Sequence, residues 1–551
     1  MISENFKDIV HKSYKSIPDY PETIFGFPKN YQEIKTLEDL LSINYKPISA
    51  KDQLRGNLII KLKKQQFPYS GIIGYEDDIV PSLNRAILSG HDILLVGQIG
   101  QAKTKIAETI ARNLLSPIPI VEGSITNDIP TSIPENELVS LLNDKEIIRH
   151  RPEFYVSTET EDKIRNNRLD TKIVWIDGAS RFKYLLATPD ISVKDLVGQI
   201  DAIKIAKRGV EIYNMESYSP GQLLLARHGV FCIDELPVLD PRKQVALLSV
   251  LQEGIYTTGS YPVIFKPNTR IISTANPIDY THSGKIIEPL YDRLKSHIIT
   301  RYPNNVYDEI KIMIQEANIS NPQNLIMPIF ILRTLAEITR IARHRPEINQ
   351  EKGVSVRMSI HSLEILISEV ERVRSIINNI KTVPRFSDIY CIHQTSKFEL
   401  SEIDDSYENR INILDTIISD AIKKTSTAYL DSIPHEKIMN LKNEFKINRN
   451  FFVSQDITGD KNNPKSYQSQ INRFNSLSEI IEIVNGKIIQ DQKQFEESLI
   501  ENPSKVDIFN DIKDPEYLAS VTELILEGFR FTNPPMLDRK EGAYVHIKQD
   551  R

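Results

Sequence analysis

The chain has 551 residues, of which 40% are hydrophobic and 26% are charged. This ordinary globular composition extends over more residues than one hydrophobic core accommodates, so we expect three or four domains. The formal net charge of -6 excludes a strongly basic field over the whole protein, and we therefore do not expect nucleic acid as a partner.

The number of cysteines and the lengths of the apolar segments indicate in which cellular compartment we expect the protein. Only two cysteines occur, Cys232 and Cys391, which excludes a disulfide scaffold and a Cys-x-x-Cys zinc ribbon. The N-terminal residues lack the apolar stretch of a signal peptide, and no segment approaches the roughly 20 apolar residues of a membrane helix. We expect a cytoplasmic protein that is not embedded in a membrane.

Residues 1–50 read as an N-terminal extension, and residues 51–303 as an α/β core. Alternation of strands with helices predicts a parallel sheet. Short apolar runs that predict its five buried strands occupy residues 91–97, 117–123, 229–235, 269–277 and 297–303. Residues 124–215 are polar and mixed, so we interpret them as insertions on the core. Alternating runs around Gly259 predict a β-hairpin over residues 255–265.

After Pro303 the apolar spacing becomes helical and remains so. This spacing predicts a helical lid over residues 304–380, in which Ile331, Leu335 and Ile338 form one apolar stripe. Residues 381–551 predict a mainly α-helical C-terminal region whose role the sequence does not indicate.

A phosphate-binding loop is predicted between the first strand and the helix over residues 103–115. Its residues are Gly97, Gln98, Ile99, Gly100, Gln101, Ala102, Lys103 and Thr104. In this context backbone N–H groups face the phosphates, a lysine neutralises the β and γ oxygens, and a threonine hydroxyl ligates Mg²⁺. The usual loop has glycine at position 102. Alanine fits if its φ is negative, as we expect where the chain enters a helix. An ordinary strand–turn–helix with a surface lysine is the alternative interpretation.

A second motif favours the phosphate site. The strand over residues 229–235 ends in Asp234 and Glu235, at the sheet edge where ligands of α/β proteins bind. Asp234 would hold Mg²⁺, and Glu235 would act as the general base for the attacking water. Asn276 ends the next strand, where its amide would orient that water, although Asn-Pro alone is a common turn signal.

The order of these motifs resembles the AAA+ ATPases of the MoxR and magnesium-chelatase I-subunit group. The resemblance covers roughly residues 70 to 370. It is carried by GIIGYEDD, GQIGQAKT, TPDISVKDLVG, SPGQLLLARHGVFCIDELPVLD, ALLSVLQEG, STANP, LYDRLKSHI and GVSVRMSI. Alanine before the loop lysine is frequent in that group.

The resemblance implies further roles. Arg293 matches the arginine finger that reaches the γ-phosphate of a neighbouring subunit, and Arg357 matches the sensor-2 arginine, acting in cis or in trans. Residues 255–265 and 198–213 match two hairpins that face the pore or a partner in this group. The resemblance also implies a homo-oligomeric ring, with a hexamer as the expected size, and a separate partner with a von Willebrand A domain.

The sequence therefore predicts an ATP- and Mg²⁺-dependent ATPase that remodels or matures a client protein. Three alternatives remain open. A magnesium chelatase subunit would act on a porphyrin, for which we find no recognisable site. A DNA-associated motor or transcription regulator would normally show a helix-turn-helix or a Gly-Ala-Phe-Thr-Gly-Ala loop, and neither is present. A nucleotide-gated scaffold would not need Asp234, Glu235 and Arg293 together.

Overall fold

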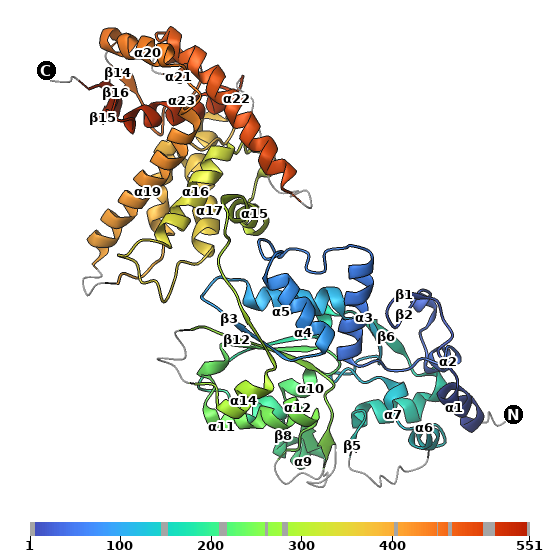
Figure 1. Cartoon of the computed structure of the whole chain (residues 1–551). Coiled ribbons are helices and arrows are strands. Elements are labelled where there is room, and N and C mark those ends of the chain that lie inside the picture. The colour runs from blue at the N-terminus through green and yellow to red at the C-terminus, as the bar shows by residue number, and fades with distance from the viewer. Residues whose placement is uncertain are drawn as a thin grey trace. The chain divides into compact units, whose positions relative to one another are not determined.

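The computed structural model describes residues 6–144, 153–208, 217–258, 263–277, 285–401, 406–448, 450–460, 466–499 and 513–547. These residues form two compact units (Figure 1). The first comprises Met1–Gly97 and Ala102–Arg301, and the second comprises Gln98–Gln101 and Tyr302–Arg551. Among the described helices, none is both long and apolar enough to cross a membrane.

Five parallel strands form the central sheet of the first unit, in the order β13–β3–β12–β10–β7. Their bounds are β3 (Ile93–Val96), β7 (Phe182–Leu186), β10 (Val230–Asp234), β12 (Arg270–Ala275) and β13 (Ser296–Ile299). The three inner strands are almost entirely buried, as expected for a parallel sheet covered on both faces. The predicted α/β fold with a five-stranded parallel sheet is confirmed.

One of the five predicted strands lies elsewhere. Residues 117–123 form the buried strand β4 (Ile118–Val121), but it pairs antiparallel with β6 (Ile173–Ile176) in a separate two-stranded sheet. The fifth strand of the central sheet is β7, inside the segment that we interpreted as insertions. As an edge strand with no fully buried position, β7 gives a weaker apolar signal than β4.

Helices cover both faces of the central sheet (Figure 1). On one face lie α3 (Ala50–Lys63), α4 (Ile79–Ser89) and α5 (Lys103–Leu114). On the other lie α8 (Val193–Val197), α10 (Gln222–Leu225), α12 (Leu248–Glu253) and α14 (Glu288–Arg293). Local sequence fixes the ends of α4, because the Asp78 side chain caps its first N–H group and Gly90 ends it at a φ of +65°.

The two expected hairpins are formed only in part. In residues 255–265, Tyr256 and Phe265 make an antiparallel bridge, while β11 (Ile264–Phe265) pairs parallel to β5 (Glu153–Phe154); residues 259–262 lie outside the described residues. In residues 198–213, β8 (Gln199–Ile200) pairs with β9 (Tyr218–Ser219) and is followed by helix α9 (Ala202–Arg208). Residues 209–216 also lie outside the described residues.

The N-terminal residues and the insertion build one small module on the side of the core. Its elements are α1 (Phe6–Lys15), β1 (Glu22–Ile24), β2 (Phe27–Pro28), α2 (Leu37–Ser42), β4, α6 (Glu135–Leu142), α7 (Thr158–Asn167) and β6. They share two small hydrophobic clusters, one of which joins Val10 and Leu37 to Leu138 and Ile164. Apolar side chains of the described N-terminal residues are therefore buried against the insertion.

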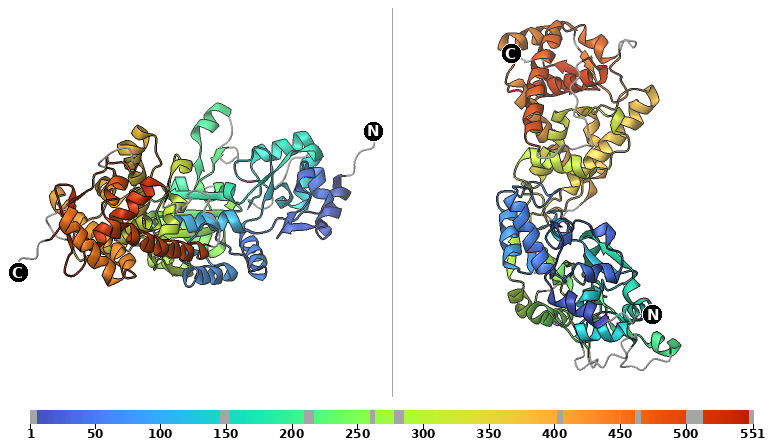
Figure 2. Two further views of the ribbon diagram at one scale, coloured as in Figure 1. Left: turned by 90° about the horizontal axis from the view of Figure 1, so that it is seen from above. Right: turned by 90° about the vertical axis from the view of Figure 1, so that its right-hand side faces the viewer.

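The second unit is mainly helical (Figures 1 and 2). Its larger helices are α15 (Val306–Glu316), α16 (Ile329–Ala342), α17 (Arg357–Val370), α19 (Tyr407–Leu430), α20 (His435–Asn448), α22 (Asn475–Glu497) and α23 (Pro515–Arg530). A three-stranded antiparallel sheet ends it, in the order β14 (Asn450–Phe452), β16 (Ala543–His546) and β15 (Leu537–Lys540).

One hydrophobic core extends through the second unit from Ile310 to Tyr544. The boundary proposed between residues 380 and 381 is not accompanied by a change of core. Buried ion pairs also cross it, since Arg374 donates to Asp388 at 2.6 Å and lies 3.5 Å from Glu516. The lid and the C-terminal region thus fold as one packed body.

Candidate nucleotide-binding site

The carboxyl ends of three neighbouring strands bring the predicted motifs together in the first unit. In the sheet, β12 lies between β3 and β10, and Val96 at the end of β3 pairs with Ala275 at the end of β12. The Gly97 N–H continues this pairing by donating to the Ala275 carbonyl at 3.0 Å. The loop therefore begins beside the strand ends that carry Asp234 and Asn276, where ligands of α/β sheets bind.

The loop leads directly into helix α5, whose first residue is Lys103. The Lys103 ammonium folds back and donates to the Gly97 carbonyl at 2.5 Å, so the side chain spans the start of the loop. Four N–H groups at a helix start have no partner within the helix, and they form a partial positive charge there. The arrangement is suited to an anion such as a phosphate.

The backbone of Ala102 corrects our expectation of a negative φ. Ala102 lies in the left-handed region, with φ +55° and ψ 19°, and Gly100 nearby has φ +75°. A left-handed conformation costs an L-residue about 1–2 kcal/mol. This is the physical reason why glycine is usual at this position. The loop therefore enters helix α5 through residues with positive φ, which the sequence motif did not reveal.

Asp234 is held by three hydroxyl groups. The Thr104 hydroxyl donates to its Oδ2 at 3.1 Å and the Tyr184 hydroxyl to the same oxygen at 3.0 Å, while the Thr274 hydroxyl donates to Oδ1. Burial, with the nearby negative charge of Asp234, raises the pKa of Tyr184 to about 12, so the phenol stays a donor at neutral pH. Thr104 of the loop and Asp234 of the strand, to which the sequence assigns the same metal ion, are thus in direct contact.

The donor set fits a magnesium ion. Thr104 and Asp234 supply a hydroxyl and a carboxylate oxygen, which are the hard oxygen ligands that Mg²⁺ prefers. In the described part of the chain, no group of three or more histidines, cysteines and acids is arranged to hold a metal.

Glu235 follows Asp234 in a left-handed conformation with φ +55°. Its backbone N–H donates to the Thr274 hydroxyl at 3.0 Å. Thr274 therefore contacts both acidic residues, accepting from the backbone of one and donating to the carboxylate of the other. Asn276 lies two residues further on, directly after β12.

The two predicted arginines lie in different units. Arg293 ends α14 and donates to the Gln252 amide oxygen at 2.8 Å and to the Pro289 carbonyl at 2.7 Å, so it is held on its own chain. Arg357 is the first residue of α17 in the second unit. Its side chain is exposed, and its backbone N–H donates to the Ser355 hydroxyl at 3.1 Å.

The loop residues Gln98 to Gln101 are part of the second unit. Gln98 donates to the Gln350 and Glu351 carbonyls at 2.6 and 3.1 Å, and the Ile99 carbonyl accepts from Tyr302 at 2.9 Å. A side chain at Gly100 would collide with Ser355, because an added Cβ would lie 2.0 Å from the hydroxyl oxygen.

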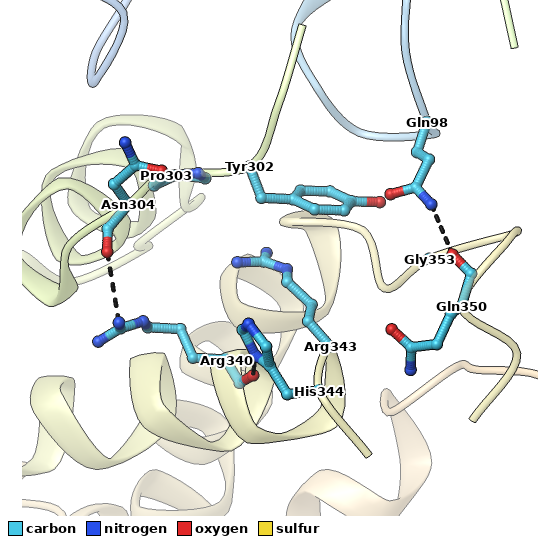
Figure 3. A pocket seen from close by; sticks show the side chains of 9 residues that line it. All are labelled: Gln98, Tyr302, Pro303, Asn304, Arg340, Arg343, His344, Gln350 and Gly353. Atoms are coloured by element: carbon cyan, nitrogen blue, oxygen red, sulfur yellow. Dashed lines mark hydrogen bonds between the residues drawn. The ribbon is translucent and has the colours of Figure 1, made fainter. Parts of the chain in front are cut away.

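A cavity of about 290 Å³ lies beside Gln98 in the second unit (Figure 3). It is lined by Gln98, Tyr302, Pro303, Asn304, Arg340, Arg343, His344, Gln350 and Gly353. Arg343 lies 4.2 Å from the centre of the Tyr302 ring and binds Glu309 with two hydrogen bonds of 2.8 and 3.0 Å. Arg340 donates to the Asn304 carbonyl at 3.3 Å. The amide and guanidinium groups of this lining are suited to a polar or anionic ligand.

Sequence reasoning missed Thr274 and Tyr184. Thr274 lies inside the STANP motif, and its position opposite the end of β10 was available from a parallel alignment of the two strands. No sequence pattern pointed to Tyr184 as a site residue, because the strand that carries it was not predicted.

Comparisons with known proteins support the nucleotide-binding fold. Residues 214–300 match the family model of the Sigma-54 interaction domain, and they include Asp234, Glu235, Asn276 and Arg293. The uncharacterized protein YeaC of Bacillus subtilis (strain 168) is 25% identical over 203 residues, a match that spans 32% of this chain and 58% of YeaC. Less than two thirds of that relative is therefore covered.

Two solved structures give weaker likenesses. A model of the magnesium chelatase BchI–BchD complex is 16% identical, covers 63% of this chain and 99% of that one, and has a TM-score of 0.32. A crystal structure of NtrX from Brucella abortus is 14% identical, covers 56% and 53%, and has a TM-score of 0.31. With TM-scores this low, neither likeness identifies the fold by itself. The family match over residues 214–300 and the five-stranded parallel sheet are consistent with an α/β P-loop core in the first unit.

Proposed function

We propose that this chain binds ATP with Mg²⁺, hydrolyses it in a homo-oligomeric ring, and uses the cycle to remodel a client protein. The observation that carries the proposal is the 3.1 Å contact between Thr104 at the helix start and Asp234 at the neighbouring strand end. Two separate sequence motifs meet there, with Lys103 beside them.

Each residue would have a distinct task. Gly97 to Thr104 would bind the triphosphate through backbone N–H groups and the Lys103 ammonium. Thr104 and Asp234 would hold Mg²⁺, which when bound neutralises charge on the phosphate oxygens. Glu235 would accept a proton from the attacking water, and Asn276 would orient that water.

Arg293 would complete the site of a neighbouring subunit. For this it must leave Gln252 and the Pro289 carbonyl, to which it is bonded within its own chain. Such a finger contributes about 10³–10⁵-fold to turnover where it has been measured. Arg357 would sense the nucleotide in cis or in trans. A hexameric ring, a von Willebrand A partner and a cytoplasmic location complete the proposal, which for these points relies on the family resemblance.

The test compares Lys103→Ala and Glu235→Gln with the unaltered chain. Lys103→Ala should lose ATP binding in calorimetry, whereas Lys105→Ala on the same helix should keep it. Glu235→Gln should bind ATP but release no phosphate, and Glu253→Gln, at an exposed position of α12, is its control. Unchanged ATP affinity in Lys103→Ala would contradict the phosphate site, and normal phosphate release by Glu235→Gln would exclude its role as base.

The trans role of Arg293 has its own test. Arg293→Ala should be inactive alone and should regain turnover when mixed with Glu235→Gln, because mixed rings contain interfaces with both residues intact. No recovery at any ratio would indicate that Arg293 acts on its own chain.

A second candidate is a regulator that acts on a sigma-54 protein, favoured by the family match over residues 214–300. The sequence lacks the Gly-Ala-Phe-Thr-Gly-Ala loop expected of such activators. A pull-down from native extract with the ATP-bound Glu235→Gln variant distinguishes these two functions. Capture of a von Willebrand A protein supports the remodelling proposal, whereas capture of a sigma factor supports the regulator.

A further inference from the structure

Asp234 receives more donors than the proposed catalytic residues account for. Thr104 belongs to the phosphate loop, and Thr274 also accepts from the backbone of Glu235. The third donor, Tyr184, comes from the edge strand β7 and has no role among the functions proposed above. Its hydroxyl lies 3.0 Å from Oδ2 of Asp234, the same oxygen that Thr104 contacts.

The sheet register explains how Tyr184 reaches this carboxylate. Tyr184 pairs with Cys232, and side chains of paired residues in a parallel sheet lie on the same face. Asp234 is two residues further along β10 and therefore projects from that face as well. The long tyrosine side chain extends along the sheet to the strand end. Among the described strands β7 is at the edge of the sheet, and Tyr184 is 46% exposed there.

We propose that Tyr184 is a positioning residue that sets the affinity of the site for Mg²⁺ by holding Oδ2 of Asp234 in place. The inference rests on the proposed function, since it assigns Thr104 and Asp234 to the metal. Tyr184 touches neither the nucleotide nor the metal in this scheme, and acts only through the carboxylate.

The physical reason is orientation. A carboxylate on a strand end rotates about its side-chain bonds unless donors fix it, and an unrestrained ligand loses conformational entropy when it binds. Thr104 can ligate a metal with its lone pair and still donate its proton to Asp234, so Oδ2 keeps both donors when the site is loaded. Hydrogen-bond partners of metal ligands commonly change metal affinity by 10–100-fold. We expect a smaller effect here, because water reaches the exposed phenol.

The experiment removes only the hydroxyl. Tyr184→Phe keeps the ring, and its exposed position leaves room for the same packing, so the variant should fold. Leu186→Ala is the matched control, because Leu186 is also half-exposed on β7 and pairs with Asp234 without a polar contact to it. Binding of a non-hydrolysable ATP analogue is titrated with Mg²⁺ by calorimetry, and ATP turnover is measured against Mg²⁺ in parallel.

Tyr184→Phe should need roughly three- to tenfold more Mg²⁺ for half-maximal analogue binding and for half-maximal turnover, with kcat restored at saturating Mg²⁺. Leu186→Ala should keep the Mg²⁺ dependence of the unaltered chain. An unchanged or lower requirement in Tyr184→Phe, or an equal shift in Leu186→Ala, would overturn the inference. If the unaltered chain bound no analogue at any Mg²⁺ concentration, the proposed function itself would fail, which is a separate result.

Discussion

Replacing Thr274 by valine should destabilise the first unit by removing one hydroxyl that serves two acidic residues. Thr274 is fully buried, accepts from the Glu235 N–H at 3.0 Å and donates to Asp234. Valine has nearly the same volume, so the substitution leaves no cavity. It leaves the Glu235 N–H without this acceptor, and it takes one of three hydroxyl donors from Asp234.

The magnitude follows from these two losses. A buried polar group deprived of its partner costs about 1–3 kcal/mol. The loss at Asp234 is smaller, because Thr104 and Tyr184 still donate to its other oxygen. Together we expect Thr274→Val to lower the free energy of unfolding by about 2–4 kcal/mol. Thr274→Ser keeps the hydroxyl and loses one methyl group, which costs about 1 kcal/mol.

The single tryptophan of the chain provides the assay. Trp175 lies in the first unit, 5.5 Å from the ring of Phe27 and 5.7 Å from that of Tyr45, so its fluorescence reports that unit. Urea unfolding followed at Trp175 should rank the unaltered chain above Thr274→Ser, and Thr274→Ser above Thr274→Val. If the valine variant were as stable as the serine variant, the hydroxyl would not support the two acidic residues.

Two further predictions use the same fluorescence assay. Ala102→Gly should be neutral or stabilising by up to about 1 kcal/mol, because it relieves a left-handed alanine; a loss of about 1 kcal/mol, as in an ordinary first helical turn, would show that φ is negative. Burial, with the positive charges of Arg227 and Arg181, lowers the pKa of His228 well below 6.5. The folded chain favours neutral His228. Its contribution to the free energy of unfolding should therefore be fully present above about pH 6.5 and decrease as the pH falls below that value. His228→Asn, suited to the φ of +60° there, should lessen this acid sensitivity, and an unchanged pH profile would exclude His228 as a source.

The sequence alone determined the elements whose physical signal is local. Buried strands such as β3 and β10 are continuous apolar runs, and a buried strand requires them wherever it lies. The loop before Lys103 was recognisable because phosphate binding needs backbone N–H groups, a cation and a hydroxyl within a few residues. Asp234 was predictable because the strand that carries it ends with it. Thr104 and Asp234 lie in contact at 3.1 Å, and their assignment to Mg²⁺ stays a prediction.

Tertiary structure alone decided which strands pair and which side chains meet. The apolar content of β4 says that it is buried but not against what, so its pairing with β6 was not predictable. Tyr184 reaches Asp234 only because β7 lies next to β10, two segments separated by more than 40 residues. The left-handed φ of Ala102 was also hidden, because it belongs to the turn from β3 into α5 and runs against the backbone preference of alanine.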